Sequence, residues 1–297
     1  MSILQSIILG LVQGLTEFLP VSSSGHLAIL KYLFGISDEV GIGFDILLHV
    51  GTLIAVFAVY YKDIWHLIVS AIQMIAAICR NIGRLCRRIG KTDEYKETIP
   101  YEKIITTQWK LFTVFIIIST IPVGIAGFLL ESYVEKISAG LLIPGICLLI
   151  TGVLLLLAEA VPEGNKSIKD MSIKDALIIG CAQACAIFPG LSRSGCTISA
   201  SLMTGLKRNV AVKYSFIMSI PAILGAALKT LLDIIGGEAT GEVGALPCII
   251  GLVISAVVGY LAIKLMLNVV RKKKFRYFSF YCFAVGLVAI IGYFVTK

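Results

Sequence analysis

Six apolar segments of this chain are long enough to cross a lipid bilayer as helices. A helix needs about 20 residues to span a hydrocarbon core of roughly 30 Å, and runs such as LFTVFIIISTIPVGIAGFLL (111–130) reach that length. Of all residues, 58% are hydrophobic and only 15% are charged, which is atypical of soluble domains. The sequence therefore predicts an all-α polytopic membrane protein, a single integral membrane domain over 1–297, with six transmembrane helices at roughly 44–61, 109–130, 138–160, 212–232, 247–270 and 277–296.

Two further apolar stretches, 3–34 and 175–207, are interrupted near their middles by Pro, Gly and Ser. Irregular backbone at membrane depth is tolerated only where it is buried in protein or lines a wet cavity. We therefore predict that these stretches form two re-entrant helix hairpins instead of spans.

Charge sets the predicted orientation. The loop 62–108 is rich in Lys and Arg, and the loop 271–276 reads RKKKFR, so the positive-inside rule places both in the cytoplasm. The acidic loop around Asp233, Glu238 and Glu242 then falls outside. Within the cytoplasmic loop, residues 66–90 are predicted to form a basic amphipathic helix on the inner leaflet. Because topology accounts for the net charge of +8, we expect membrane lipids as partners and no nucleic acid.

The two interrupted stretches resemble each other. GLVQGLTEFLPVSSSG (10–25) aligns without a gap on GCAQACAIFPGLSRSG (180–195), at an offset of 170 residues, and the offset continues from 44–58 to 214–228. The predicted topology gives the two copies opposite orientations. This predicts an inverted-topology repeat, with repeat 1 at about 1–160 and repeat 2 at about 175–297, whose hairpin tips meet at the midplane.

The two tips carry complementary polar groups. The first supplies Glu17, Ser23 and His26, and the second supplies Arg193 at the position equivalent to Ser23. An arginine fork beside small residues at a helix start suits a phosphate or carboxylate. We predict that phosphate is bound by Ser22, Ser24, Ser192, Arg193, Ser194 and Thr197.

A carboxylate beside an anion site needs its own explanation. Glu17 would bind a divalent cation together with phosphate oxygens, or act as acid or base. His26 is a candidate general acid or base and Ser23 a candidate nucleophile. The alternative is structural: Glu17 would neutralise Arg193, and the serines would join helices. Asp45 and His49, one turn apart on the first span, either pack against the hairpins or support the site.

The segments QGLTEFLPVSSSGHL (13–27) and FPGLSRSGCTISASLMTGLKR (188–208) closely resemble the undecaprenyl-diphosphate phosphatases of the bacitracin-resistance type, over essentially the full length. In that family the first motif has Glu or Gln followed four residues later by Glu, here Gln13 and Glu17. Its essential serine and histidine fall on Ser23 and His26, and its arginine motif on Ser192, Arg193 and Thr197. The resemblance implies Mg²⁺ or Ca²⁺ as cofactor, with Glu17 and Gln13 near the metal.

The resemblance also implies a substrate, a location and a physiological role. Such an enzyme hydrolyses undecaprenyl diphosphate to undecaprenyl phosphate and inorganic phosphate in the bacterial inner (plasma) membrane, with its active site facing the outer side. It recycles the lipid carrier for cell-wall synthesis and confers resistance to bacitracin, which competes for the same polyprenyl diphosphate. A homodimer is among the assemblies to be tested.

Two functions account for the residues. The first is a lipid diphosphate phosphatase, acting through a phosphoseryl intermediate or by direct attack of water. The second is a transporter or flippase, because inverted repeats with midplane hairpins also suit alternating access. Transport of an anion requires the cation, but neither a nucleophile nor a base.

Overall fold

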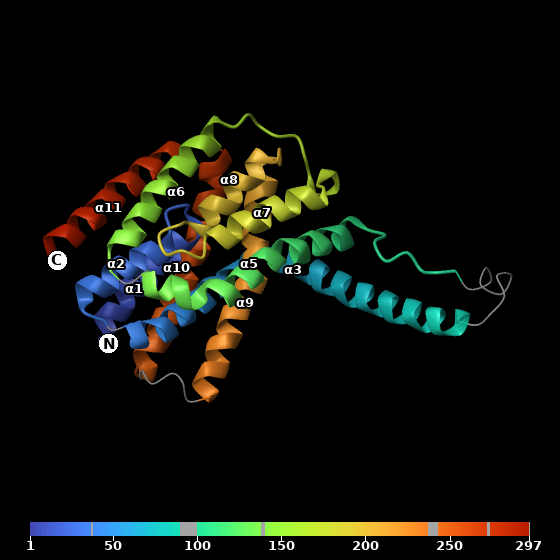
Figure 1. The fold of residues 1–297 in the computed structure, drawn as a ribbon, viewed down its shortest axis with the longest axis horizontal. Coiled ribbons are helices and arrows are strands. Elements are labelled where there is room, and N and C mark those ends of the chain that lie inside the picture. The colour runs from blue at the N-terminus through green and yellow to red at the C-terminus, as the bar shows by residue number, and fades with distance from the viewer. Residues whose placement is uncertain (37, 90–99, 138–139, 237–242, 272–273, 297) are drawn as a thin grey trace.

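The computed structural model describes all residues except 37, 90–99, 138–139, 237–242, 272–273 and 297 (Figure 1). Over this part the chain is almost entirely helical, with a short 3₁₀ turn at Ile168–Asp170 and an isolated bridge between Lys166 and Leu206. The α-helices are α1 (Ile3–Phe18), α2 (Ser23–Phe34), α3 (Asp38–Arg88), α5 (Gln108–Ile137), α6 (Leu142–Ala160), α7 (Ile173–Cys185), α8 (Arg193–Met203), α9 (Arg208–Ile235), α10 (Ala245–Arg271) and α11 (Phe275–Thr296).

The predicted all-α polytopic fold is confirmed. Among the described residues, six helices are long and apolar enough to cross a membrane: Gly43–Arg88, Gln108–Leu130, Leu142–Ala160, Arg208–Asp233, Ala245–Val270 and Phe275–Thr296. Each contains one of the six predicted segments or most of it. The acidic Glu238 and Glu242 used for the orientation lie outside the described residues.

Each interrupted stretch folds as two short helices joined by a turn. α1 ends at Phe18, shortly before Pro20, and α2 begins after Ser22, whose hydroxyl accepts a bond from the Gly25 amide at 3.2 Å. In the same way α7 ends before Pro189, and the Ser192 hydroxyl accepts a bond from the Gly195 amide at 3.0 Å. Proline disfavours helix at the residue before it, and serine is a favoured N-cap, so the sequence itself breaks both helices.

The two turns touch each other. The Gly190 amide donates to the Ser24 hydroxyl at 3.4 Å, and the Ser194 hydroxyl donates to the Leu19 carbonyl at 3.2 Å. A side chain on Gly25 would collide with the Gly190 backbone, which shows how closely the turns pack. The predicted meeting of the tips is therefore present in the structure.

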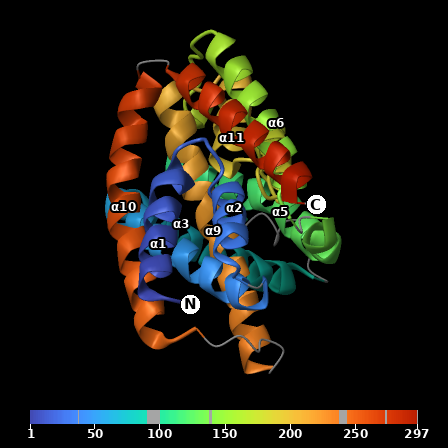
Figure 2. The same ribbon diagram turned by 90° about the vertical axis from the view of Figure 1, so that its left-hand side faces the viewer.

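Corresponding helices begin at a constant offset. α1 and α7 start at 3 and 173, α2 and α8 at 23 and 193, and α3 and α9 at 38 and 208, a difference of 170 each time. The packing corresponds as well, because α1 lies along α10 (Figure 2) and α7 lies along α5. Gly10 and Gly180, also 170 apart, both lie where these helices pack closely on their partners, because an added Cβ would meet a backbone oxygen of α10 at 3.0 Å and of α5 at 2.6 Å. These correspondences support the repeat; the opposite orientation of its copies in a membrane stays a prediction.

Helix α3 differs from the prediction of a span ending near 61 and a separate helix over 66–90. The helix continues to Arg88 and has a kink at Tyr60 (φ −111°, ψ 23°). No Gly or Pro lies between Gly51 and Gly83, so nothing in the sequence stops the helix at the end of the span. At 1.5 Å per residue, 51 residues extend over about 76 Å, more than twice a hydrocarbon core. The second half must therefore leave the membrane core or lie along its surface.

This second half extends away from the other helices (Figure 1) and carries a continuous exposed apolar face. The face continues one side of the span, where Tyr61 is exposed, and the arginines of this segment lie on its other sides. Its exposed members include Trp65, Ile68, Ile72, Ile75, Cys79, Ile82 and Cys86. This pattern supports the predicted amphipathic helix on a membrane surface.

Spin labels on this face test that prediction. In otherwise cysteine-free variants, labels on Cys79 or Cys86 are expected to relax with dissolved oxygen and to be shielded from a water-soluble nickel reagent, as in lipid. A label at Gln73→Cys, on the opposite face, should show the reverse. Equal nickel access on both faces would contradict the membrane placement, and spin–spin coupling between labels would indicate a second copy instead.

Candidate active site at the meeting of the hairpins

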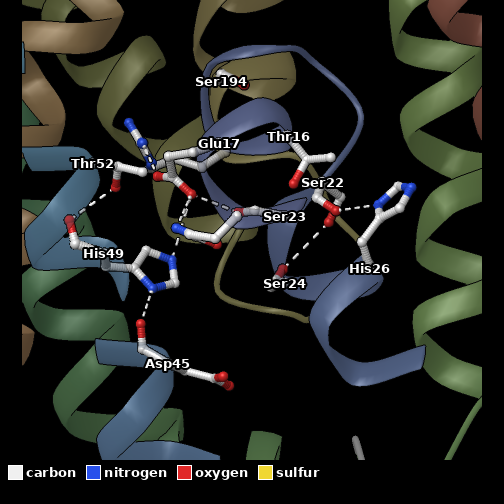
Figure 3. Close-up of polar contacts among 12 residues, drawn as sticks. Thr16, Glu17, Ser22, Ser23, Ser24, His26, Asp45, His49, Thr52 and Ser194 are labelled. Carbon is white, nitrogen blue, oxygen red and sulfur yellow. Dashed lines mark hydrogen bonds and ion pairs between the residues drawn. The ribbon is translucent and has the colours of Figure 1, made fainter. Parts of the chain in front are cut away.

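The buried carboxylate of Glu17 is the centre of the polar cluster. One oxygen, Oε2, accepts hydrogen bonds from the Ser23 hydroxyl at 2.5 Å and from the Gln13 amide at 3.0 Å. The other oxygen, Oε1, forms an ion pair with Nη2 of Arg193. Glu17 is only 5% exposed, so these contacts replace water around its charge. Figure 3 shows the Ser23 side chain beside the Glu17 carboxylate.

Local structure explains why these side chains meet. Gln13 and Glu17 lie four residues apart on one face of α1. Ser23 and Arg193 are the first residues of α2 and α8, at equivalent positions of the two hairpins. These equivalent positions bring a hydroxyl to one oxygen of the Glu17 carboxylate and a guanidinium to the other.

His49 is a further member of the cluster. Its Nδ1 lies 2.7 Å from the Asp45 carbonyl oxygen, which can only accept, so Nδ1 carries a proton. Its Nε2 lies 3.5 Å from Glu17 Oε2. The Asp45 carboxylate pairs with Lys31 at 2.5 Å. The sequence left open whether His49 packs against the hairpins or supports the site, and the fold places it at the carboxylate.

His26 lies apart from this cluster. Its Nδ1 is 2.7 Å from the Ser22 carbonyl oxygen and its Nε2 is 2.7 Å from the Tyr281 hydroxyl of α11. Figure 3 shows the ring on the other side of Ser23 from Glu17. The structure thus does not bring His26 into contact with the predicted nucleophile or carboxylate, and its role in proton transfer stays a prediction.

The predicted phosphate-binding residues fall into two groups. Ser22, Ser24 and Arg193 line a cavity, together with Glu17, Ser23 and His49. The others lie behind it and join helices: the Ser192 hydroxyl caps α8, Ser194 contacts Leu19, and Thr197 is hydrogen-bonded to Ser215 at 2.6 Å. Their contribution to phosphate binding stays a prediction, and the structure shows them holding the second hairpin in place.

The cavity has a volume of about 320 Å³ and a mixed lining. Apart from the polar residues at its base, its walls are apolar and come from α3, the second hairpin and α9. Sequence reasoning did not single out these wall residues, because Ile, Leu and Ala are common throughout the chain. They are Ile46, Ala186, Ile187, Leu191, Ala222, Ile223 and Ala226. The site can therefore hold a molecule with an anionic head and an apolar tail.

Few protein ligands are available here for a metal ion. Within the described part of the chain, no group of three or more His, Cys, Asp or Glu side chains is placed to hold one. Glu17 is the one carboxylate among the described lining residues, and both its oxygens are bonded. Gln13 Oε1 is buried without a hydrogen-bond partner and offers one further oxygen. These residues fit a hard cation only if a bound anion supplies most of its oxygens.

The fold and cavity define an integral membrane protein with a serine–carboxylate–arginine site for an amphiphilic anion. Residues 6–288 match the family model described as bacitracin resistance protein BacA. Proteins named undecaprenyl-diphosphatase are 42% identical over 293 residues in Methanobrevibacter smithii and 41% identical over 291 residues in Methanosphaera stadtmanae, covering 98% of each chain. One from Desulforapulum autotrophicum is 37% identical over 296 residues, covering 100% of each. The chain belongs to the BacA family.

Proposed function

We propose that this protein is an integral membrane phosphatase that hydrolyses undecaprenyl diphosphate to undecaprenyl phosphate and inorganic phosphate. One observation carries the proposal: a serine hydroxyl donates to a buried carboxylate that also binds an arginine, and all three groups line a cavity whose other walls are apolar. A nucleophile within reach of a base, which is itself oriented by a third group, is the arrangement required for covalent catalysis. The relatives named undecaprenyl-diphosphatase support the choice of substrate.

The chemistry follows from the contacts of Ser23. Glu17 accepts the Ser23 proton while Oγ attacks the terminal phosphorus, forming the serine phosphate ester. The bond from that phosphorus to the bridging oxygen breaks, and the lipid monophosphate leaves with the electron pair. Water then attacks the phosphorus of this ester and the bond from phosphorus to Ser23 Oγ breaks. Glu17 returns its proton to Oγ, the proton lost by the water goes to solvent, and inorganic phosphate leaves. Arg193 stabilises the charge on the phosphoryl oxygens during both steps.

Arg193 has a second donor nitrogen that can bind a phosphate oxygen. Its Nη2 is paired with Glu17, but its Nη1 has no hydrogen-bond partner among the described residues. A buried, unsatisfied guanidinium nitrogen is costly, and a phosphate oxygen would relieve that cost. The substrate is thus bound without breaking the pair that orients Glu17.

The position of the cavity supports access from the outer side. On α3 it is lined by Ile46 and His49, near the end of the span that charge places outside. On α9 it is lined by Ala222 and Ala226, in the half that leads to the predicted outer end. In the plasma membrane this would recycle the carrier lipid for cell-wall synthesis and remove the diphosphate that bacitracin binds.

The proposed reaction also uses a divalent cation. When bound, Mg²⁺ or Ca²⁺ would neutralise charge on the diphosphate, with Glu17 and Gln13 supplying oxygens beside those of the substrate. Because the protein offers so few ligands, we expect chelation by EDTA to abolish phosphate release and added Mg²⁺ or Ca²⁺ to restore it. Full activity in excess chelator would show that phosphate release does not require a divalent cation.

Lipid transport is the alternative that the repeated architecture favours. The two functions separate in vesicles that contain the purified protein and undecaprenyl diphosphate. We expect inorganic phosphate to be released with many turnovers per protein. Exchange of the lipid between leaflets without phosphate release would instead identify a transporter.

A further inference from the structure

Ser22 has a backbone conformation that serine rarely adopts. Its φ of 67° and ψ of 94° make it the one non-glycine residue with positive φ among those the structure describes. Such a conformation is costly and persists only where surrounding contacts enforce it. Ser22 directly precedes Ser23, so its conformation sets where the Ser23 hydroxyl lies relative to Glu17.

His26 holds the Ser22 carbonyl. Its ring Nδ1 lies 2.7 Å from that oxygen, and its backbone amide donates to the same oxygen at 3.3 Å. A carbonyl oxygen can only accept, so the ring proton lies on Nδ1 and Nε2 is left as an acceptor. The hydroxyl of Tyr281 lies 2.7 Å from Nε2 and is therefore the donor. Both ring nitrogens are thus occupied by protein contacts.

Helix α11 holds this arrangement through contacts with His26 and with the turn between α1 and α2. The rings of His26 and Tyr281 are stacked, with an interplanar angle of 2° and centroids 5.5 Å apart. The next residue, Cys282, lies with its sulfur 3.9 Å from the Pro20 carbonyl, so α11 contacts the same turn twice. α11 is in turn packed closely on α6, where Gly286 and Gly145 bring the backbones together.

We propose that Tyr281 and His26 form a brace that fixes Ser22 and thereby aims the Ser23 hydroxyl at Glu17. Both are positioning residues, and His26 exchanges no proton with the substrate. This inference rests on the proposed phosphatase function and assigns a role to α11, which contributes no side chain to the cavity lining.

Matched substitutions test the brace through activity. Tyr281→Phe keeps the stacked ring and removes only the hydroxyl, and should lower kcat by about tenfold or less with little change in KM. Tyr277→Phe, one turn away and exposed, should have no effect. His26→Ala should lower kcat by about 100-fold, because a shift of the reacting groups by about 1 Å can slow a reaction by that factor. His26→Asn, whose amide can replace the Nδ1 donor, should recover most of the loss with an unchanged pH profile.

Nitrogen NMR of the histidine rings gives a readout that does not depend on turnover. Wild-type His26 should keep the neutral Nδ1–H form from about pH 5 to 8, the range in which an unconstrained histidine changes charge. Its Nε2 signal should shift in Tyr281→Phe. If the wild type shows this form but releases no phosphate, the brace stands and the proposed function fails. If His26 titrates together with kcat, or His26→Asn is as inactive as His26→Ala, the brace is overturned.

Discussion

Replacing Arg193 with alanine is expected to lower kcat for phosphate release by about 10²–10³-fold, the usual effect of removing one fixed group that stabilises transition-state charge. Arg193 is the one cation lining the described part of the cavity whose charge does not depend on pH. Arg193→Lys should recover part of the loss, because lysine restores the charge but not the planar fork. The measurement is steady-state phosphate release from undecaprenyl diphosphate at saturating lipid.

Stability must be separated from catalysis in this variant. Arg193→Ala leaves the buried Glu17 carboxylate unpaired, which costs about 3–5 kcal/mol in comparable sites. The double variant Arg193→Ala/Glu17→Gln removes both charges and should recover thermal stability while remaining inactive. Near wild-type kcat in a folded Arg193→Ala protein would contradict the role of Arg193 as phosphate clamp.

The second large effect is expected for Glu17→Gln. Glutamine is nearly isosteric and still accepts the Ser23 bond, but it cannot take the proton, so kcat should fall by about 10²–10⁴-fold. Gln13→Ala is the matched comparison, because it removes the amide contact to the same carboxylate oxygen and one oxygen offered to the cation, but leaves the proton acceptor in place. Its loss should be about tenfold or less.

The proposed role of Glu17 as proton acceptor requires a larger loss of kcat in Glu17→Gln than in Gln13→Ala. If Gln13→Ala were as damaging as Glu17→Gln, the shared role of the two residues as cation ligands would explain both losses, and proton acceptance by Glu17 would not be needed. If Glu17→Gln retained wild-type kcat, the carboxylate would be the structural partner of Arg193 and nothing more.

Much of the site was predictable because the two copies of the repeat still resemble each other in sequence. The 170-residue offset aligned Ser23 with Arg193, and the predicted entry of the two hairpins from opposite sides of the membrane implied that their tips would meet. Long apolar segments define spans by length alone, so the six transmembrane helices were predictable too.

Other parts depend on contacts that no local pattern encodes. His26 lies two residues after the serine run, yet its ring contacts Tyr281, 255 residues away in sequence, and not Ser23 or Glu17. His49 reaches Glu17 only because α3 packs beside the first hairpin. The end of α3 could not be placed because loss of apolar character at the end of a span does not stop a helix that lacks Gly or Pro.

The ion pair between Glu17 and Arg193 is also what a purely structural reading of the cluster expects. That reading also allows the Ser23 hydroxyl to bond the same carboxylate at 2.5 Å, but it does not account for a cavity of about 320 Å³ with apolar walls beside the cluster. A lipid phosphatase needs both the serine and the cavity.

The most direct measurement follows phosphate on Ser23 during the first turnover. Wild-type protein is mixed with undecaprenyl diphosphate and divalent cation, quenched in acid at short times, and analysed by mass spectrometry of the peptide that contains Ser23. The account predicts phosphoserine at Ser23 that forms before inorganic phosphate appears, and neither product in folded Ser23→Ala. Release of phosphate by Ser23→Ala at the wild-type rate would contradict it.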